Sequence, residues 1–476
     1  MKSQFLGESY ALRSLPLSAQ SLINLYAEFN ETAEGEVGAL YGTPGLTLRA
    51  TLNGLPGRAL QTSGDGSLLY AVAGNTVYQF SGGNWNPTTC GTLRTNSGVI
   101  NTTANFTQVL FSDSAGFTVA TGTNLTTVSG APTGAADITY MDGYGLFALN
   151  NDGEFGLTSI NDFTTRSGLD VATAEGLPDD LIAVYADQRE VWLFGTLSTE
   201  IWSDTGAAAF PFERIPGGVL QVGCAARNSV VFCDGSVFWL ATDQTGKIIV
   251  ARTVGYQTMR VSTHALEHVF NSYSTVGDAY AYSYSQEGHS FYVLTFPTAD
   301  ATWVFDTSGP PGTRWARRAW QDTDGVLHAQ LPAAYANFNN EHVVIDRTNG
   351  NIYTLDLDTT TDNGTPIYRE RAWPLTPAQE MHRMRVDEIE LVQEGGTGAV
   401  SGTDTNPQIW LQMSFDGGQN FGYQRTVNSG PIGVTNYRTR WRRCGTGRRP
   451  VARIATTSTR KISWLGANMR GEVLSV

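Results

Sequence analysis

The chain has 476 residues, of which 41% are hydrophobic, 16% are charged and 52 are glycine. This composition favours many strands joined by tight turns over long helices, and the length allows two or three domains. No run of about 18 apolar residues occurs, so we expect no membrane anchor, and the start of the chain lacks the apolar segment of a secretory signal. The four cysteines form no CxxC pair, which favours reduced thiols in a protein made in a cytosol.

The net charge of −13 is divided unevenly along the chain. Residues 417–476 hold ten arginines and one lysine against a single acid, Glu472, for a balance of +10, so residues 1–416 carry −23. Arginine is favoured where a flat fork must bind carboxylates or phosphates. The basic end of the chain is therefore either a solvated face or a docking surface for an acidic partner or a nucleic acid.

The first fifty residues do not follow the pattern of the chain that comes after them. A short extended segment, Asn24–Glu28, is followed by acidic residues and then by a Pro-Gly turn within Leu40–Leu46. We predict that residues 1–50 form an N-terminal arm, packed on the body of the protein or on a neighbour.

A hairpin-sized pattern then returns about seven times, in which a turn such as Asp234-Gly235 separates two apolar runs. The repeats lie near 68–80, 107–120, 144–160, 189–206, 228–252, 288–306 and 340–356. A period of about 40 residues is typical of four-stranded propeller blades. We predict an all-β fold in which residues 51–365 form a β-propeller of six or seven blades, with a short helix near Arg260–Phe270. A pair of β-sandwiches is the alternative.

After residue 365 the pattern changes to that of a separate β-domain. Five strands, near 383–392, 408–415, 434–443, 450–456 and 462–468, predict a basic, sandwich-like domain over 366–476. One turn in it fits the Asp-box pattern, in which an aspartate accepts backbone N–H groups, and which is a structural device. Its residues are Ser414, Asp416, Gly418 and Phe421.

The segment Tyr437–Arg449 of this domain alternates arginines with aromatic or small residues. Alternation predicts a strand with three arginines on its outer face and with Trp441 on the opposite face. The outward arginines are Arg438, Arg440 and Arg442, and the same segment contains Arg443, Arg448 and Arg449.

No residue pattern supports catalysis or the binding of a cofactor or metal, so we expect a protein that is not an enzyme. His264 and His268 are four residues apart, but no third metal ligand accompanies them. Arg214-Ile215-Pro216 matches a sialidase tripeptide, but a single Asp-box follows it, some 200 residues later. Walker, GxSxG and Rossmann motifs are missing from the sequence.

Several segments, taken in order, resemble the packaged DNA stabilisation proteins of short-tailed bacteriophages, which are also called tail hub or nozzle proteins. The resembling segments are INLYAE, LYGTPGL, residues 187–218, residues 223–240, residues 287–306, MSFDGGQNFGYQR and YRTRWRRCGTGR. No single motif is diagnostic. Their order carries the resemblance, which spans most of the chain.

The resemblance implies a structural virion protein of the phage tail, assembled in the host cytoplasm. Such proteins form a homo-hexameric ring below the portal adaptor, extend the DNA channel and help retain the packaged genomic dsDNA, which passes without sequence-specific binding. They also carry the tail needle or plug, and tailspikes or fibres attach around them. The six arginines of the basic segment are then candidates for the adaptor interface. Candidates for the subunit interface are Trp315, Arg317, Arg318 and Trp320.

Two other functions compete with this one. The first is a propeller glycosidase or polysaccharide depolymerase that acts on host surface sugars, and the second is a receptor-binding or sugar-binding protein without catalysis. An enzyme should gather carboxylates and arginines in one pocket on the propeller axis, whereas a ring component should present broad surfaces for its neighbours.

Overall fold

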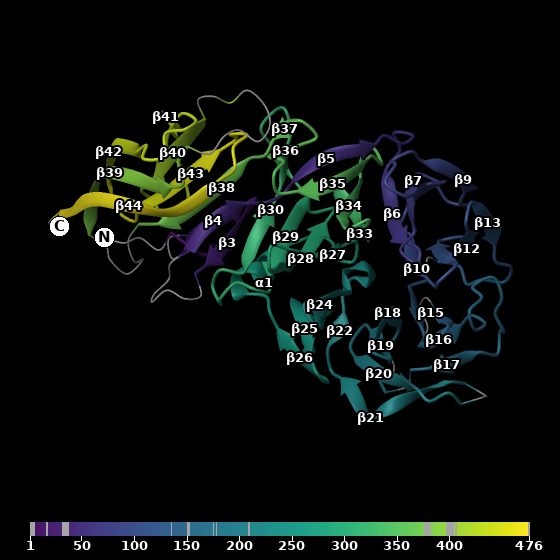
Figure 1. The fold of residues 1–476 in the computed structure, drawn as a ribbon. Helices are drawn as coiled ribbons and strands as arrows, with labels where there is room; N and C mark the ends of the chain where they lie inside the picture. The colour runs from purple at the N-terminus through teal and green to yellow at the C-terminus, as the bar shows by residue number, and fades with distance from the viewer. Residues whose placement is uncertain are drawn as a thin grey trace.

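The protein, described here by a computed structural model, is almost entirely β-sheet. The structure describes residues 5–15, 18–30, 38–134, 136–149, 153–174, 176–177, 179–207, 210–375, 382–396, 404 and 407–474. Figure 1 shows a ring of sheets built from the middle of the chain and, beside it, a smaller body that holds the C-terminal strands. The predicted all-β fold is confirmed.

Seven sheets in the described part of the chain form the blades of the ring. Blade one consists of β6 (Gly57–Thr62), β7 (Leu68–Ala73), β8 (Thr76–Ser81) and β9 (Thr88–Thr92). Blade two consists of β10 (Asn101–Ala104), β11 (Val109–Asp113), β12 (Gly116–Thr121) and β13 (Asn124–Thr127). Blade three consists of β14 (Ile138–Met141), β15 (Tyr144–Ala148), β16 (Glu154–Leu157) and β17 (Val171–Thr173).

Blades four to six follow in chain order. Blade four consists of β18 (Leu181–Asp187), β19 (Glu190–Gly195), β20 (Thr199–Asp204) and β21 (Phe212–Leu220). Blade five consists of β22 (Gly223–Cys224), β23 (Val231–Cys233), β24 (Ser236–Thr242), β25 (Ile248–Val254) and β26 (Gln257–Arg260). Blade six consists of β27 (Tyr280–Gln286), β28 (His289–Phe296), β29 (Ala301–Asp306) and β30 (Trp315–Arg318).

The seventh blade takes its outer strand from the start of the chain. Its first three strands are β33 (Pro332–Phe338), β34 (Glu341–Asp346) and β35 (Ile352–Asp356), and β5 (Gly45–Ala50) pairs antiparallel with β35. Two short hairpins flank this blade, β31 (Trp320–Gln321) with β32 (Leu327–His328), and β36 (Thr361–Asp362) with β37 (Thr365–Pro366). The predicted six or seven blades are thus seven.

The hairpins form where the turn residues require them. Asp234 and Gly235 both have positive φ, 47° and 70°, between the directly paired Cys233 and Ser236. Two central residues of positive φ match the right-handed twist of the flanking strands, and Asp and Gly tolerate that conformation. Local turn chemistry therefore sets the register of this hairpin.

Hydrophobic clusters fill the space between neighbouring blades. Phe117 of blade two packs edge-on against Phe147 of blade three, with ring centroids 5.3 Å apart. Leu69 of blade one and Val343 of blade seven share another cluster, which closes the ring. Each fully buried side chain of this kind contributes about 1.5–3 kcal/mol.

The predicted short helix is present as α1 (His264–Phe270). The Thr263 side chain accepts a hydrogen bond from the backbone N–H of Leu266 and so caps its first turn. Leu266 and Phe270 are buried in the cluster between blades five and six. The helix therefore packs against blades five and six of the ring.

The smaller body is a β-sandwich of two sheets, and both contain N-terminal strands. One sheet holds β1 (Tyr10–Ala11), β2 (Ala19–Ile23), β38 (Arg369–Pro374), β43 (Val451–Thr456), β40 (Gln408–Ser414) and β41 (Arg425–Asn428). The other, in spatial order, is β3 (Leu25–Phe29), β4 (Gly38–Gly42), β44 (Ser463–Leu474), β39 (Arg383–Gln393) and β42 (Thr439–Gly447). The predicted N-terminal arm therefore packs on the body of the protein, where its strands form part of both sheets and of blade seven.

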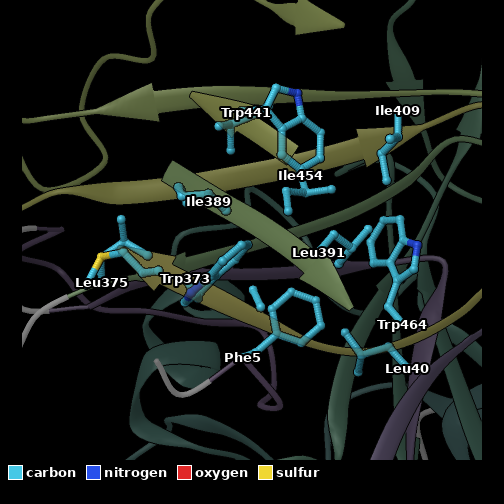
Figure 2. Packing of buried hydrophobic residues seen from close by; sticks show 14 of the residues in the cluster. Phe5, Leu40, Trp373, Leu375, Ile389, Leu391, Ile409, Trp441, Ile454 and Trp464 are labelled. Atoms are coloured by element: carbon cyan, nitrogen blue, oxygen red, sulfur yellow. The ribbon is translucent and has the colours of Figure 1, made fainter. Parts of the chain in front are cut away.

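Buried aromatic and aliphatic side chains from both sheets form the core of the sandwich, shown in Figure 2. Trp373, Trp441 and Trp464 are at most 1% exposed. Phe5, near the start of the chain, meets Trp373 edge-on with ring centroids 4.9 Å apart. The N-terminal segment is therefore part of this core.

A buried arginine, Arg371 of β38, ties the N-terminal segment to the sandwich. Its guanidinium donates hydrogen bonds to the backbone oxygens of Phe5 (2.7 Å), Glu8 (3.3 Å) and Ser21 (3.2 Å) and to the side-chain oxygen of Gln20 (2.8 Å). Burial lowers the pKa of Arg371 to about 9, an effect that the charge of Glu8 partly opposes. The side chain thus satisfies four oxygens from segments that are distant from it in sequence.

Replacing Arg371 with Met should lower the free energy of unfolding by about 3–5 kcal/mol, because it leaves buried acceptors without donors and removes one of the two positive charges that act on Glu8. Urea unfolding followed by tryptophan fluorescence measures this loss. Arg383→Met, at an exposed position of β39, is the matched control and should change stability little. Equal stability of the two variants would contradict the assigned role of Arg371.

Candidate functional site

The arginine-rich strand is β42, and its side chains alternate as the sequence predicts. Thr439 and Trp441 are buried, while Arg438 and Arg442 are exposed. Beyond Arg442 the strand bulges against β39, and Arg443 takes a positive φ of 56°. The bulge changes the alternation, so that Arg443 is exposed as well as its neighbour.

The arginines of this face are not equivalent. Arg438 holds Glu390 of β39 through two hydrogen bonds of 2.6 Å, and Arg442 bonds Glu388 of the same strand at 3.0 Å. The bonds from Arg438 lower the pKa of Glu390. Of the six predicted arginines, Arg440, Arg443 and Arg448 have no carboxylate within ion-pair distance among the described residues, although Arg440 is the cross-strand neighbour of Glu390. The outer face therefore carries rows of both charges, and its free guanidiniums are a subset of the predicted six.

The Asp-box turn has the hydrogen bonds that its pattern predicts. The Ser414 hydroxyl donates to Asp416 at 2.6 Å, and Asp416 accepts the backbone N–H groups of residues 419 and 420. Gly418 has a φ of +91°, and Phe421 lies under the guanidinium of Arg453, 3.9 Å from its carbon. The turn lies in the sandwich, after β40, and its groups are engaged in holding its own shape.

The candidate subunit interface divides into buried and accessible residues. Trp315 is 1% exposed, and its indole N–H donates to the backbone oxygen of Val261. Arg318 is 6% exposed, with its guanidinium over the rings of Tyr284 and Phe291. These two side chains lie inside the subunit, because β30 is covered on both faces. Arg317 and Trp320 are partly exposed.

Trp320 belongs to the hairpin β31–β32, which is held by a histidine between two carboxylates. The two ring nitrogens of His328 lie 2.6 Å from Asp300 and 3.1 Å from Asp322. Arg347 also contacts Asp300, at 3.4 Å. Hydrogen bonds to Asp300 and Asp322 raise the pKa of His328. The contact of His328 with Asp300 thus attaches the hairpin to a loop of blade six, and Arg347 of blade seven contacts the same carboxylate.

A cleft that no sequence pattern indicated lies between the propeller and the sandwich, with a volume of about 400 Å³. Tyr26 and Tyr41 line it, with ring centroids 6.0 Å apart. Four carboxylates and two cations lie around them, namely Glu28, Glu287, Asp356, Asp358, Arg369 and Lys461. The side chains come from four separate segments of the chain, within 26–43, 286–287, 356–369 and 461–462, so their convergence depends on the tertiary fold.

A second cavity, of about 670 Å³, follows the axis of the propeller, and all seven blades line it. Charged residues of both signs face it, including Arg227, Asp137 and Asp278. Burial raises the pKa of Asp137 to about 7, against opposing effects of the Val184 N–H and of Arg227. The volume equals that of roughly twenty water molecules.

The motifs considered for chemistry are dispersed in the structure. Arg214 lies in β21 at 3.7 Å from Glu200, on a different domain from the Asp-box. Within the described residues, no group of three or more His, Cys, Asp and Glu side chains could hold a metal ion. No helix in this part of the chain is long and apolar enough to cross a membrane. All four cysteines are free thiols.

The structure is a closed seven-bladed propeller that shares a sheet with a β-sandwich, with charged groups both on the outer face of the sandwich and around the propeller axis. The chain belongs to the bacteriophage P22 Gp10 family of phage tail structural proteins. The family's β-propeller model matches residues 7–360, and its β-sandwich model matches residues 368–472. The protein is therefore a structural component of the virion.

Among solved structures, three similar chains share low sequence identity with this one. The N-terminal domain of Nup159 is 11% identical, covers 71% of this chain and 99% of its own, and has a TM-score of 0.43. A chain of a mitotic checkpoint complex is 11% identical, covers 69% of this chain and 96% of its own, and has a TM-score of 0.41. The β-propeller domain of Cps50 (Swd1) from Myceliophteria thermophila is 8% identical, covers 65% of this chain and 99% of its own, and has a TM-score of 0.40. Curated protein sequences contain no match.

Replacing Trp441 with Ala should lower the free energy of unfolding by about 3–5 kcal/mol, because it opens a cavity in the sandwich core and removes the indole bond to Arg425. Glu390→Gln, which removes an exposed ion pair on the same sheet, should cost less than about 1 kcal/mol. Urea unfolding compares the two. Similar losses would mean that the outer ion pairs, and not the core, hold β42.

Replacing His328 with Gln should loosen the β31–β32 hairpin in a pH-dependent way. A raised pKa in the folded state gives stabilisation that is complete below the unfolded value of about 6.5 and is lost as pH rises through the folded value. Hydrogen exchange over residues 320–328 should therefore differ most between variant and wild type below about pH 6.5, and the difference should shrink as the pH rises through the raised pKa of His328. A difference that does not change with pH would show that the ring is held by packing alone.

Proposed function

We propose that this chain assembles as a hexameric ring below the portal adaptor, where it extends the DNA channel and helps retain the packaged genome. The ring also carries the tail needle or plug, and tailspikes or fibres attach around it. Assembly takes place in the host cytoplasm. Membership of the P22 Gp10 family is the observation that carries this proposal.

The connection between the two domains supports a role as a stiff wall element. β2 pairs with β30 of blade six and with β38 of the sandwich, so one sheet runs through both bodies. Domains joined by a short linker and a small interface are expected to move relative to each other. Here such movement would break backbone hydrogen bonds, which suits a subunit that must keep its shape under load.

The position of the axial cavity indicates where the duplex would pass in such a ring. The cavity lies within one subunit and is lined by that subunit's own blades, whereas a ring of subunits has its axis between them. In the proposed assembly the DNA therefore runs between the subunits, and the propeller of each subunit is part of the wall around it.

The charge division along the chain suits this arrangement. Residues 1–416 carry −23, and a wall of that sign repels the duplex and keeps it from adhering during ejection. The arginines of residues 417–476 supply the opposite charge, through which the sandwich holds the adaptor and neighbouring subunits.

Mixing the protein with its portal–adaptor complex tests the proposal. Negative-stain images should show a six-fold ring at the adaptor, and mass photometry should show the added mass of six chains. A chain that stays monomeric in the presence of the complex would overturn it. Cleavage of host surface glycans by that monomer would instead establish the glycosidase alternative.

A further inference from the structure

The five-stranded sheet of the sandwich has opposite charge at its two edges. β42 forms one edge, and three strands separate it from β3 at the other. Since neighbouring strands lie about 4.8 Å apart, the two edges are about 19 Å from each other. Within one subunit these groups therefore cannot neutralise each other directly.

The β42 edge offers guanidiniums that remain available. Arg443 and Arg448 are exposed and Arg440 is half-buried, and none has a carboxylate within ion-pair distance among the described residues. Their neighbours Arg438 and Arg442 are held by Glu390 and Glu388. These two ion pairs hold β39 and β42 together on this face, and the three arginines without such a partner extend from it.

The β3 edge forms the cleft of about 400 Å³ beside the propeller. Glu28 and Glu287 are exposed there, and in the described part of the chain neither has a lysine or arginine within ion-pair distance, although Glu28 lies 3.9 Å from Nε2 of His289. Lys461 contacts Asp358 at 3.1 Å, which neutralises one other carboxylate of the rim. The cleft therefore keeps excess negative charge.

The lining of the cleft suits a guanidinium better than an inorganic cation. Tyr26 is buried, at 9% exposed, so the aromatic surface next to the carboxylates is mainly that of half-buried Tyr41. A guanidinium stacks on an aromatic ring and bonds a carboxylate with its edge at the same time. Burial raises the pKa of Tyr26, and the negative charge of Glu28 raises it further.

We propose that the cleft of each subunit receives the free arginines of β42 from the next subunit, so that a second copy of this chain is its occupant. This inference rests on the proposed ring and assigns the contact that closes it. Two different patches that meet head to tail make a heterologous interface, and such an interface repeated around an axis gives a closed ring. The β3 edge provides the carboxylates of this interface, and the β42 edge provides its guanidiniums.

The other candidate occupant of the β42 edge is nucleic acid, which the charge pattern disfavours. Glu388 and Glu390 lie on the same outer face as Arg440, one strand away. A duplex presents a uniform row of phosphates, whereas on this face the two carboxylates already engage Arg438 and Arg442, which leaves fewer guanidiniums for phosphate. A protein surface with separate acidic groups matches the alternating rows better.

Site-specific crosslinking tests the contact in rings assembled on the portal–adaptor complex, with Cys90→Ser as background because the three other cysteines are buried. Subunits with Arg443→Cys and subunits with Glu287→Cys are mixed and treated with a short bis-maleimide. We expect crosslinked dimers from the mixture and a ladder up to six chains from the double variant. Rings that form without these crosslinks would overturn the inference and leave the proposed function intact.

Charge exchange provides the second test. The triple variant Arg440→Glu, Arg443→Glu, Arg448→Glu should lose ring assembly, and so should Glu28→Arg, Glu287→Arg. A chain that carries all five substitutions should regain rings, because each interface then has its charges exchanged. Arg189→Glu, an exposed arginine of positive φ on blade four, is the matched control and should assemble normally.

Thermal unfolding of each variant shows whether loss of assembly reflects loss of folding. If all variants fold and the chain with all five substitutions does not form rings, the two edges do not meet. If the triple arginine variant still forms rings but loses salt-sensitive binding to duplex DNA, the β42 edge binds nucleic acid, and the inference is wrong.

Discussion

The arrangement of the whole subunit depends on the backbone hydrogen bonding of β2 between two other strands. Ile23 pairs in parallel with Arg317 at the outer strand of blade six, and residues 21–23 pair antiparallel with β38. An outer strand left open would expose a row of unpaired N–H and C=O groups. β2 covers this edge and continues the sheet into the sandwich, so protection of one domain and its attachment to the other are achieved by the same bonds.

Buried arginines strengthen the junction that β2 creates. Arg318 lies over aromatic rings, Arg369 lies beside Asp362, and Arg371 is bonded to backbone oxygens. Burial lowers the pKa of Arg369 to about 10 and raises that of Asp362 to about 7. A slip in strand register would leave such a group buried without partners, at a cost of several kcal/mol. The junction therefore disfavours alternative pairings as well as separation of the domains.

The sequence predicts those parts of the fold that local chemistry determines. The seven hairpins were located because apolar runs and residues such as Asp234-Gly235 act over a few positions. The role of β5 was not predictable, since its partner β35 lies some 300 residues later. Alternation placed the arginines of β42 on the outer face, but it could not show which are held by Glu388 and Glu390. Trp315 was assigned to a surface because a strand pattern does not show that both faces of a strand are covered.

Closure of the seventh blade by β5 has a consequence for synthesis of the protein. A ribosome releases residues 45–50 early and residues 352–356 late, and β2 likewise waits for the strand that begins at Arg369. Early blades can pack on one another as they emerge, but the ring stays open until β35 has been made, and β2 lacks its later partners until β30 and β38 have been made. Chains that end before residue 352 would thus lack both a sealed ring and a complete sandwich, so only longer molecules could enter an assembling tail.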